Sequence, residues 1–379
     1  MLDLFILAAE PSADLYGALL IKELLQLRPN LKIAAVAGPQ MRSLPIKTLF
    51  PMENLQVMGF LDVIIALPKL IHQFFTIRNK ILQLSPRAFV SIDYPGFNLQ
   101  LTRSLKKKGF EGKLIHYICP TVWAWKKKRI PHMAETLDLL LTLFPFEKKC
   151  FVETKLHVEY VGHPLVSKIS FHSRSAIKPD SLEQGLSSSE KKILALFPGS
   201  RETEIRRNFP IQLRVAKKLL ALDPTLEIAV SNIHQNYIPL LTSDIPLTHY
   251  PAGENYILMQ KAYAAIATSG TVTLELALHN VPTVVNFAIR SLDLFIAQRI
   301  FRINLPFYCI VNIVLSRQIF PELFGPNLTE ERLFFSIHKL WTNEAIRAEI
   351  QNGCAALRTA LGKKNASLEA AGAVLSQFL

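Results

Sequence analysis

The sequence predicts an α/β protein built from two Rossmann-like domains, each with a parallel sheet covered by helices. Three observations lead to this fold class. Apolar runs of strand length alternate with helical patterns, the alternation occurs in two series, and a stretch rich in serine and charge divides them at residues 170–191. A chain of 379 residues is also long enough for two such domains. We therefore expect domains at 1–167 and 168–350, and a C-terminal helical segment at 351–379 that packs back on an N-terminal domain.

The first series begins with a buried strand and a helix that starts at a proline. The apolar run 2–8 ends before Glu10, and Pro11 suits the first turn of a helix that extends to about Leu27. Later apolar runs of this half predict strands at 31–37, 87–92, 113–118, 137–143 and 159–161. Strands joined by crossover helices pair in parallel, so these runs predict one parallel sheet.

The stretch from Val57 to Phe75 is strongly apolar but interrupted by charged and polar residues and a proline. It does not predict a bilayer-spanning helix, which needs about 20 mostly apolar residues. One interpretation is a core helix with its approach loop. The other is a surface patch, including Phe60, Ile64 and Ile65, that contacts lipid or an acyl chain.

Two further stretches of the first half carry candidate functional residues. Asp93 follows the expected strand 87–92, and open α/β sheets place ligands at this end of their strands. A carboxylate there can act as a general base or cap the next helix. Trp123 and Trp125 precede four cations at 126–129, a pattern found where bases stack, at lipid interfaces and on solvated helix faces.

The second series contains two turns that are candidate phosphate sites, and it has further expected strands at 226–231 and 283–287. The run 193–197 leads through Gly199 and Ser200 to Arg201 and a helical pattern. A helix N-terminus offers backbone N–H groups to an anion, and a guanidinium suits phosphate oxygens. An ordinary strand-to-helix turn with a surface arginine is the alternative.

The second of these turns follows the expected strand 263–268. Ser269, Gly270 and Thr271 form a small-residue turn at a helix start, and the helix carries Glu275, whose carboxylate can accept hydrogen bonds from a ribose. Two such turns in one domain favour a nucleotide phosphate more than either does alone. Neither is a Walker loop and no G-x-G-x-x-G occurs, which disfavours P-loop ATPase and classical NAD chemistry.

Composition narrows the class of partner without selecting one. The formal charge is +13, with +8 in residues 1–165 and +5 in the remainder, which suits nucleic acid, anionic lipid or phosphorylated substrates. The four cysteines are widely spaced and no acidic or histidine cluster has a metal-ligand spacing, so we expect no disulfide, no metal and no cofactor. The first residues lack the pattern of a signal peptide.

Six sequence motifs narrow the possible function further: IDYPGFN, YICPTVWAWKKKRI, LFPFEKK, VGHPL, FPGSRETEI and SGTVTLE. In this order they closely resemble the lipid-A-disaccharide synthase family of GT-B-type glycosyltransferases, from Leu7 to at least Glu322. The resemblance implies two domains facing across a cleft. It implies an inverting transferase that joins UDP-2,3-diacylglucosamine to 2,3-diacylglucosamine 1-phosphate, giving the β-1,6 lipid A disaccharide 1-phosphate and UDP without a metal. It further implies a cytoplasmic protein of a Gram-negative bacterium, peripherally associated with the inner membrane.

The resemblance also implies roles for individual residues. Asp93 matches a catalytic candidate, with Glu10 and Asp14 of the first loop as rivals for the base. The residues that match the family's nucleotide and donor side are Gly199, Ser200, Arg201, Ser269, Gly270, Thr271, Glu275 and Asn312. Ser12, the 57–75 patch and the two tryptophans are expected on the acceptor and membrane side. Ala9 and Ala13 replace two glycines of the family's first loop, so that loop either has ordinary φ angles or is reshaped.

Other interpretations remain open at this stage. Another UDP-N-acetylglucosamine-type transferase or epimerase would share the architecture. A non-enzymatic basic protein that binds nucleic acid or membrane would explain the charge but not the two phosphate turns or Asp93. We expect the two acylated sugars and a membrane surface as partners, no nucleic acid, and leave open a homodimer through the C-terminal segment.

Overall fold

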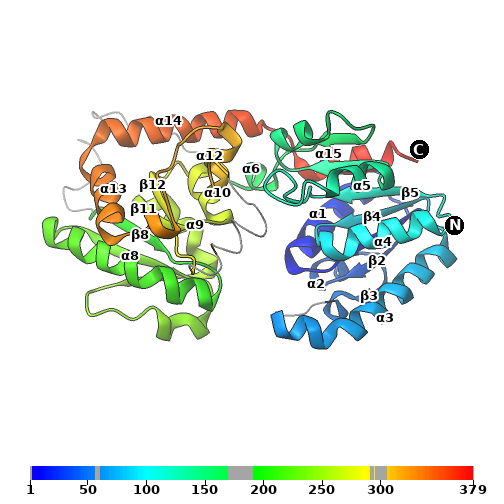
Figure 1. The fold of residues 1–379 in the computed structure, drawn as a ribbon, viewed down its shortest axis with the longest axis horizontal. Coiled ribbons are helices and arrows are strands. Elements are labelled where there is room, and N and C mark those ends of the chain that lie inside the picture. The colour runs from blue at the N-terminus through cyan, green and yellow to red at the C-terminus, as the bar shows by residue number, and fades with distance from the viewer. Residues whose placement is uncertain (1, 56–59, 170–190, 291–293, 295–304, 379) are drawn as a thin grey trace. The chain divides into compact units, whose positions relative to one another are not determined.

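The computed structural model describes residues 2–55, 60–169, 191–290, 294 and 305–378, with the side chains of 60–66 left out (Figure 1). These residues form two compact units, which are described separately. The first comprises Met1–Ser167 and Lys363–Leu379, and the second comprises Lys168–Gly362. The serine-rich stretch that we expect to link the two series lies almost wholly outside the described residues.

The first unit is built on a seven-stranded parallel sheet in the order β3-β2-β1-β4-β5-β6-β7. Its strands are β1 (Leu4–Ala8), β2 (Ile33–Ala37), β3 (Lys47–Pro51), β4 (Ala88–Ile92), β5 (Lys113–Tyr117), β6 (Leu139–Thr142) and β7 (His157–Tyr160). The sequence LFILA of β1 is buried along its whole length because both faces of the sheet are covered. The order reverses between β1 and β4, which makes the ends of these two strands the switch point of the sheet.

The helices of this unit pack on opposite faces of the sheet. They are α1 (Pro11–Leu27), α2 (Pro39–Arg42), α3 (Phe60–Leu84), α4 (Pro95–Lys107), α5 (Arg129–Thr136), α6 (Pro164–Lys168) and α15 (Ala366–Leu375), with 3₁₀ turns η1 (Met52–Asn54) and η2 (Pro145–Phe151). Leu4 and Ile6 pack with α1 and α15, whereas Phe5 and Leu7 pack with α3, α4 and α5. This division follows from the alternation of side chains along a strand.

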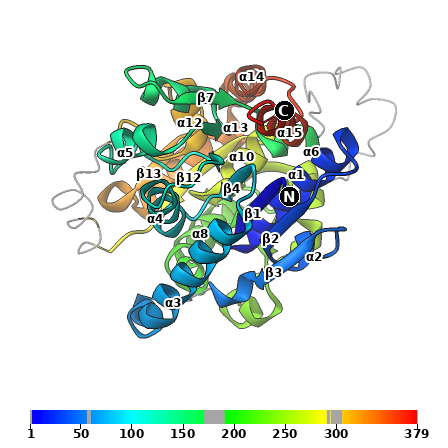
Figure 2. The same cartoon turned by 90° about the vertical axis from the view of Figure 1, so that its right-hand side faces the viewer.

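The C-terminal segment returns to the first unit, where α15 lies beside α1 (Figures 1 and 2). The return begins at Lys363 and not at the expected residue 351. The reason is that α14 (Glu344–Leu361) packs with α10, α12 and α13 and therefore belongs to the second unit.

The second unit has a six-stranded parallel sheet in the order β10-β9-β8-β11-β12-β13. Its strands are β8 (Ile193–Phe197), β9 (Glu227–Asn232), β10 (Thr248–Pro251), β11 (Ala262–Thr268), β12 (Thr283–Phe287) and β13 (Glu322–Phe324). Its helices include α8 (Glu202–Leu222), α9 (Asn255–Lys261), α10 (Thr271–Leu278), α12 (Ile310–Leu315) and α13 (Glu330–Thr342), with 3₁₀ turns η4 (Gln235–Leu240), η5 (Ala252–Glu254) and η7 (Gly325–Asn327). The order reverses between β8 and β11, so the two candidate phosphate turns follow neighbouring strands at a switch point.

The apolar stretch 57–75 falls largely in α3, which extends well beyond it to Leu84 and contains Pro68. Among the described residues, no helix is both long enough and apolar enough to cross a membrane.

Candidate functional site

A cavity of about 300 Å³ lies at the switch point of the second sheet. Ala267 of β11 pairs with Phe197 of β8, so the loops that follow these two strands meet at one edge of the sheet. The lining includes Gly199, Ser200, Ser269, Gly270, Thr271 and Glu275. Six of the eight residues expected on the nucleotide and donor side therefore line one cavity.

The start of α10 is the more open of the two turns. Gly270 is the N-cap residue and no side chain caps the helix there. A Cβ atom built on Gly270 would meet nothing within 4 Å, so the space in front of the helix is open. Uncapped N–H groups at a helix start, together with the helix dipole, favour an anion in this space.

Thr268, the last residue of β11, supports a ligand at the same place. It is buried and lines the cavity, and its Oγ1 has no hydrogen-bond partner among the described residues. Buried hydroxyl groups are rarely without a partner. This hydroxyl is therefore available to a group that enters the cavity.

Glu275 projects from the first turns of α10 into the cavity lining. The Tyr256 hydroxyl donates a hydrogen bond of 2.9 Å to its Oε1 atom. Burial raises the pKa of Glu275, opposed by the Tyr256 bond and by the charge of Lys168. A carboxylate held by one donor retains further acceptor positions for hydroxyl groups of a ligand.

Among the polar residues that line this cavity, the sequence did not single out Ser231, Asn255, Thr268 and Glu204. Ser231 lies near the carboxyl end of β9, and its Oγ donates a hydrogen bond of 2.7 Å to Oδ1 of Asn255 at the start of α9. The signal that could have found Ser231 and Thr268 is the one used for Asp93, a polar residue at the end of a buried strand. Asn255 has no such signal in the sequence.

The turn at Gly199–Arg201 differs from the expected arrangement because a carboxylate of the chain occupies its donors. Oε2 of Glu204 accepts hydrogen bonds from the backbone N–H groups of Ser200 at 3.0 Å and Arg201 at 3.3 Å. The Arg201 guanidinium pairs with Oε1 of the same residue, is 79% exposed and is not part of the cavity lining. Gly199 has φ +129°, and a Cβ there would approach Cβ of Glu204 to 2.6 Å, so this position needs glycine.

Asn312 lies away from the cavity lining and has a structural role. Its Oδ1 accepts hydrogen bonds from the backbone N–H groups of Ile319 and Phe320, and its Nδ2 donates to the Phe320 carbonyl. The amide is fully buried. These three bonds hold the segment before β13, so we do not include Asn312 in the proposed donor site.

In the first unit, the ends of β4 and β5 carry unusual backbone conformations. Asp93, Tyr94 and Ile118 have φ angles of 47°, 48° and 78°, in the left-handed region that non-glycine residues rarely adopt. Such residues cost on the order of 1–3 kcal/mol each and cluster at functional sites. The backbone of Asp93 is nevertheless fixed, because its N–H donates to the Tyr117 carbonyl and its carbonyl accepts from the Asn98 side chain.

The carboxyl group of Asp93 lies in a partly desolvated position. Burial raises its pKa, and a hydrogen bond from the Tyr94 backbone opposes the rise. A carboxylate with a raised pKa is a stronger base, which fits a role in proton transfer.

The two rival carboxylates have different surroundings. Glu10, the N-cap residue of α1, follows β1 beside the end of β4, and after burial its charge is the second cause that raises the pKa of Tyr94. Asp14 is buried and accepts hydrogen bonds of 2.8–3.1 Å from the backbone N–H groups of Gly38, Gln40 and Met41. Asp14 thus caps α2, and both of its carboxylate oxygens are engaged by backbone donors.

The first loop accommodates alanine without strain. Neither Ala9 nor Ala13 is among the residues with positive φ, and both are fully buried. Of the two alternatives left open for this loop, the structure therefore has ordinary φ angles. Ser12 is exposed in the first turn of α1.

An apolar groove of about 580 Å³ lies between α3 and α4, next to the turn that carries Asp93. Its lining includes Leu67, Ile71 and Phe75, which are 49%, 48% and 46% exposed and lie four residues apart on one face of α3. The side chains of Phe60, Ile64 and Ile65 lie outside the described residues. We refer to this feature as the α3–α4 groove.

The two tryptophan side chains each contact neighbouring residues. The Trp123 ring packs edge-on against Phe146 with centroids 5.5 Å apart. Nε1 of Trp125 donates to Oγ1 of Thr121 at 2.8 Å, and the Lys126 ammonium lies 4.0 Å from the centre of the Trp125 ring. Both rings are partly exposed in the loop after β5. Within the described part of the chain, no group of three His, Cys, Asp or Glu side chains could hold a metal ion.

The family model described as lipid-A-disaccharide synthetase matches residues 4–375. The chain belongs to this family. The lipid-A-disaccharide synthase of Chlamydia trachomatis serovar D is 38% identical over 327 residues, covering 85% of this chain and 53% of the relative. That of Geobacter sulfurreducens is 32% identical over 384 residues, covering 99% of this chain and 97% of the relative. The chain thus spans about half the length of the chlamydial family member.

Solved structures agree with the fold. The glycotransferase of kitacinnamycin has a TM-score of 0.63 at 12% identity and covers the whole of both chains. The UDP-GlcNAc 2-epimerase from Neisseria meningitidis, solved bound to UDP-GlcNAc, has a TM-score of 0.60 at 12% identity, covering 99% of this chain and 100% of that one. At this identity the likeness shows the fold alone, the α/β two-domain fold that the lipid-A-disaccharide synthetase family shares with GT-B glycosyltransferases and epimerases.

Proposed function

We propose that this chain is an inverting glycosyltransferase that makes the lipid A disaccharide. It transfers 2,3-diacylglucosamine from UDP to the 6-hydroxyl of 2,3-diacylglucosamine 1-phosphate, forming a β-1,6 bond and releasing UDP. The observation that carries the proposal is the family match over residues 4–375, in a chain whose second unit holds a cavity with an open helix N-terminus and Glu275.

The donor nucleotide is assigned to this cavity. Its diphosphate lies at the start of α10, where the uncapped helix and the Thr268 hydroxyl offer donors, and its ribose hydroxyls reach the Glu275 carboxylate. The volume of about 300 Å³ is within the range of small-molecule sites. A neighbour of the same fold was solved with UDP-GlcNAc bound, which agrees with a UDP-sugar site in this architecture.

The base is assigned to Asp93. Inversion by a single displacement needs the acceptor hydroxyl to be deprotonated as its oxygen attacks the anomeric carbon and the bond to UDP breaks. The proton passes to the Asp93 carboxylate, and the electron pair of the broken bond leaves on the diphosphate. The desolvated position of Asp93 and the strained turn that presents it support this role.

Incubation of the purified protein with both acylated sugars tests the proposal directly. The expected products, detected by mass, are the disaccharide 1-phosphate and UDP in equal amounts. Epimerisation of UDP-N-acetylglucosamine without disaccharide would identify an epimerase of the same architecture. Absence of both reactions would contradict a role in UDP-sugar chemistry.

Arg201→Ala is expected to lower kcat/KM for the UDP donor about 10- to 150-fold. The reason is that the variant loses one charge-assisted hydrogen bond to a phosphate oxygen. The exposed guanidinium stands at the start of α8 and can turn from Glu204 toward a diphosphate. Arg206→Ala is the matched control, because that guanidinium pairs with Glu202 on the exposed side of the same helix. Unchanged donor kinetics in Arg201→Ala would remove this residue from the donor site.

We also propose peripheral membrane association through the first unit, with an acyl chain in the α3–α4 groove. Changing Leu67, Ile71 and Phe75 together to serine is expected to reduce flotation with anionic liposomes, because each side chain exposes apolar surface beside a basic unit. Leu222→Ser, at a leucine 62% exposed in the second unit, is the control. Binding should weaken as salt rises. Unchanged flotation of the folded triple variant would show that this groove is not the anchor.

A further inference from the structure

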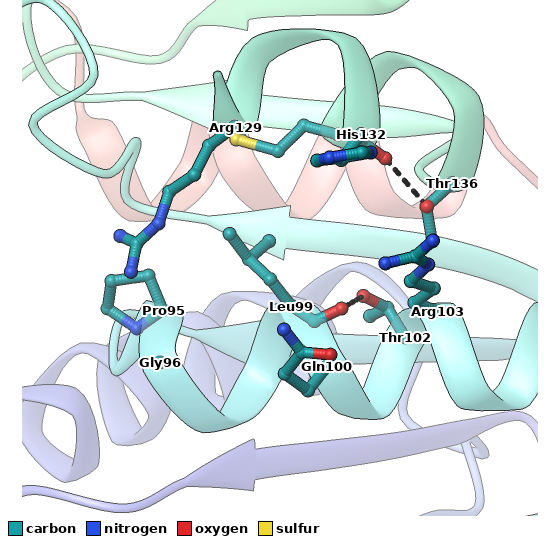
Figure 3. Close-up of a pocket in the computed structure, with 10 residues that line it drawn as sticks. Pro95, Gly96, Leu99, Gln100, Thr102, Arg103, Arg129, His132 and Thr136 are labelled. Carbon is teal, nitrogen blue, oxygen red and sulfur yellow. Dashed lines mark hydrogen bonds between the residues drawn. The ribbon is translucent and has the colours of Figure 1, made fainter. Parts of the chain in front are cut away.

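A second, smaller cavity lies in the first unit between α4 and α5 (Figure 3). Three of the residues that line it can carry positive charge: Arg103 from α4, and Arg129 and His132 from α5. Figure 3 shows Arg129 reaching toward Pro95 at the start of α4, whereas Arg103 lies near Thr136 farther along. None of these residues was singled out by the sequence beyond the run of cations at 126–129.

The positive charge of this cavity has little compensation. Neither Arg103 nor Arg129 forms an ion pair with a carboxylate of the described residues, and His132 lies 3.9 Å from the exposed Glu135. Burial lowers the pKa of Arg129, and burial, followed by the charge of Arg129, lowers the pKa of nearby Lys126. A partly buried charge without a counter-ion is unfavourable, so the cavity is suited to an anion.

The size of the cavity indicates what kind of anion fits. Its volume is about 80 Å³, several times the roughly 10–15 Å³ that a single water needs. The cavity therefore has room for a group the size of a phosphate. A guanidinium matches phosphate oxygens with paired N–H groups, and α4 presents its N-terminus without a side-chain cap.

The position of the cavity relates it to the α3–α4 groove. Gly96 and Gln100 line both hollows, which therefore lie on two sides of the first turns of α4. Asp93 comes two residues before this helix. A molecule with its acyl chain in the groove and a phosphate in the cavity would thus have its sugar near the turn of Asp93.

We propose that the Arg129 cavity binds the phosphate monoester of the acceptor and thereby selects a phosphorylated glycolipid over its dephosphorylated form. This inference rests on the proposed function, because the acceptor is the substrate named there. Arg129 acts as a specificity-determining residue that holds the end of the acceptor remote from the reacting hydroxyl.

Comparing two acceptors in the Arg129→Gln variant tests this assignment. Short-chain 2,3-diacylglucosamine 1-phosphate and the same sugar without phosphate are presented in neutral detergent micelles, so that membrane charge plays no part. The wild type should prefer the phosphorylated acceptor. Arg129→Gln should lose about 10- to 150-fold in kcat/KM on that acceptor, as one charge-assisted bond is lost, and little on the other. UDP binding and the thermal unfolding midpoint should stay unchanged.

Lys128→Gln is the matched control, because it removes an adjacent exposed cation that does not line the cavity. Equal losses on both acceptors in Arg129→Gln would overturn the proposal. The proposal would also be overturned if Arg129→Gln kept the selectivity of the wild type but floated less well with phosphatidylglycerol vesicles. That result would assign the cavity to bulk lipid headgroups.

Failure of the proposed function is distinguishable from failure of this inference. If the wild type makes no disaccharide, binding of glucosamine 1-phosphate and of inorganic phosphate is measured by calorimetry. Binding to the wild type that Arg129→Gln abolishes and Lys128→Gln retains would support the cavity as a phosphate site. Equal binding, or no binding, to wild type and Arg129→Gln would overturn it.

Discussion

Asp93→Asn is expected to lower kcat about 10²- to 10⁴-fold, the usual contribution of a general base, while UDP binding stays intact. Asparagine has nearly the shape of aspartate but cannot take the proton. It also tolerates the left-handed φ of 47° found here, so the turn should keep its conformation. UDP release gives kcat, and calorimetry with UDP reports on the proposed donor site in the second unit.

Glu10→Gln is the control for this substitution, because Glu10 follows the neighbouring strand and influences Tyr94 beside Asp93. A variant Asp93→Asn with near-normal turnover, together with an inactive Glu10→Gln, would assign the base to Glu10. Asp93 would then be a turn residue.

The pH dependence of activity gives a further expectation. Acid protonates the Asp93 carboxylate, which can then no longer accept a proton. Because burial raises the pKa of Asp93, we expect this loss of activity at a higher pH than an exposed aspartate would give.

Asp14→Ala is expected to destabilise the first unit by about 3 kcal/mol or more. Its carboxylate satisfies three backbone N–H groups at the start of α2, two of them buried and one partly buried. A buried donor left unsatisfied costs about 1–3 kcal/mol. Urea unfolding followed by far-UV circular dichroism should show the transition of the first unit at lower denaturant. Turnover should fall only as far as the folded fraction does.

Ser12→Ala provides the comparison, since Ser12 lies in the same turn of α1 but is exposed, and its loss should change stability by less than about 0.5 kcal/mol. The decisive contrast is between stability and turnover. An Asp14→Ala variant as stable as the wild type, yet inactive, would return Asp14 to the list of candidate bases.

The central strands could be predicted because their side chains are buried on both faces. Strands such as β1, β2 and β8 are unbroken apolar runs, which few other structures produce. Strands β3, β10 and β13 were not predicted, because they lie at sheet edges or have only three residues, and their side chains are partly exposed. Edge strands carry no strong apolar pattern.

The candidate site was predictable where its parts are contiguous in sequence. Ser269 to Thr271 and Glu275 lie within one turn and the helix that it opens, so a local pattern identifies them. The pairing of Ser231 with Asn255 depends on segments that only the tertiary fold brings together. The sequence pattern also does not predict the direction of side chains. Glu204 accepts hydrogen bonds from the backbone donors of its own turn, and Asn312 faces the segment before β13.

The left-handed backbone at Tyr94 and Ile118 has a consequence for directed evolution of this chain. Glycine adopts these φ angles without steric penalty, whereas a β-branched residue such as Ile118 is strongly disfavoured there. A library selected only for heat resistance should therefore accumulate glycine or asparagine at 94 and 118. Such variants would survive heating while the loops proposed to shape the acceptor side loosen, so thermal tolerance and turnover would have to be selected together.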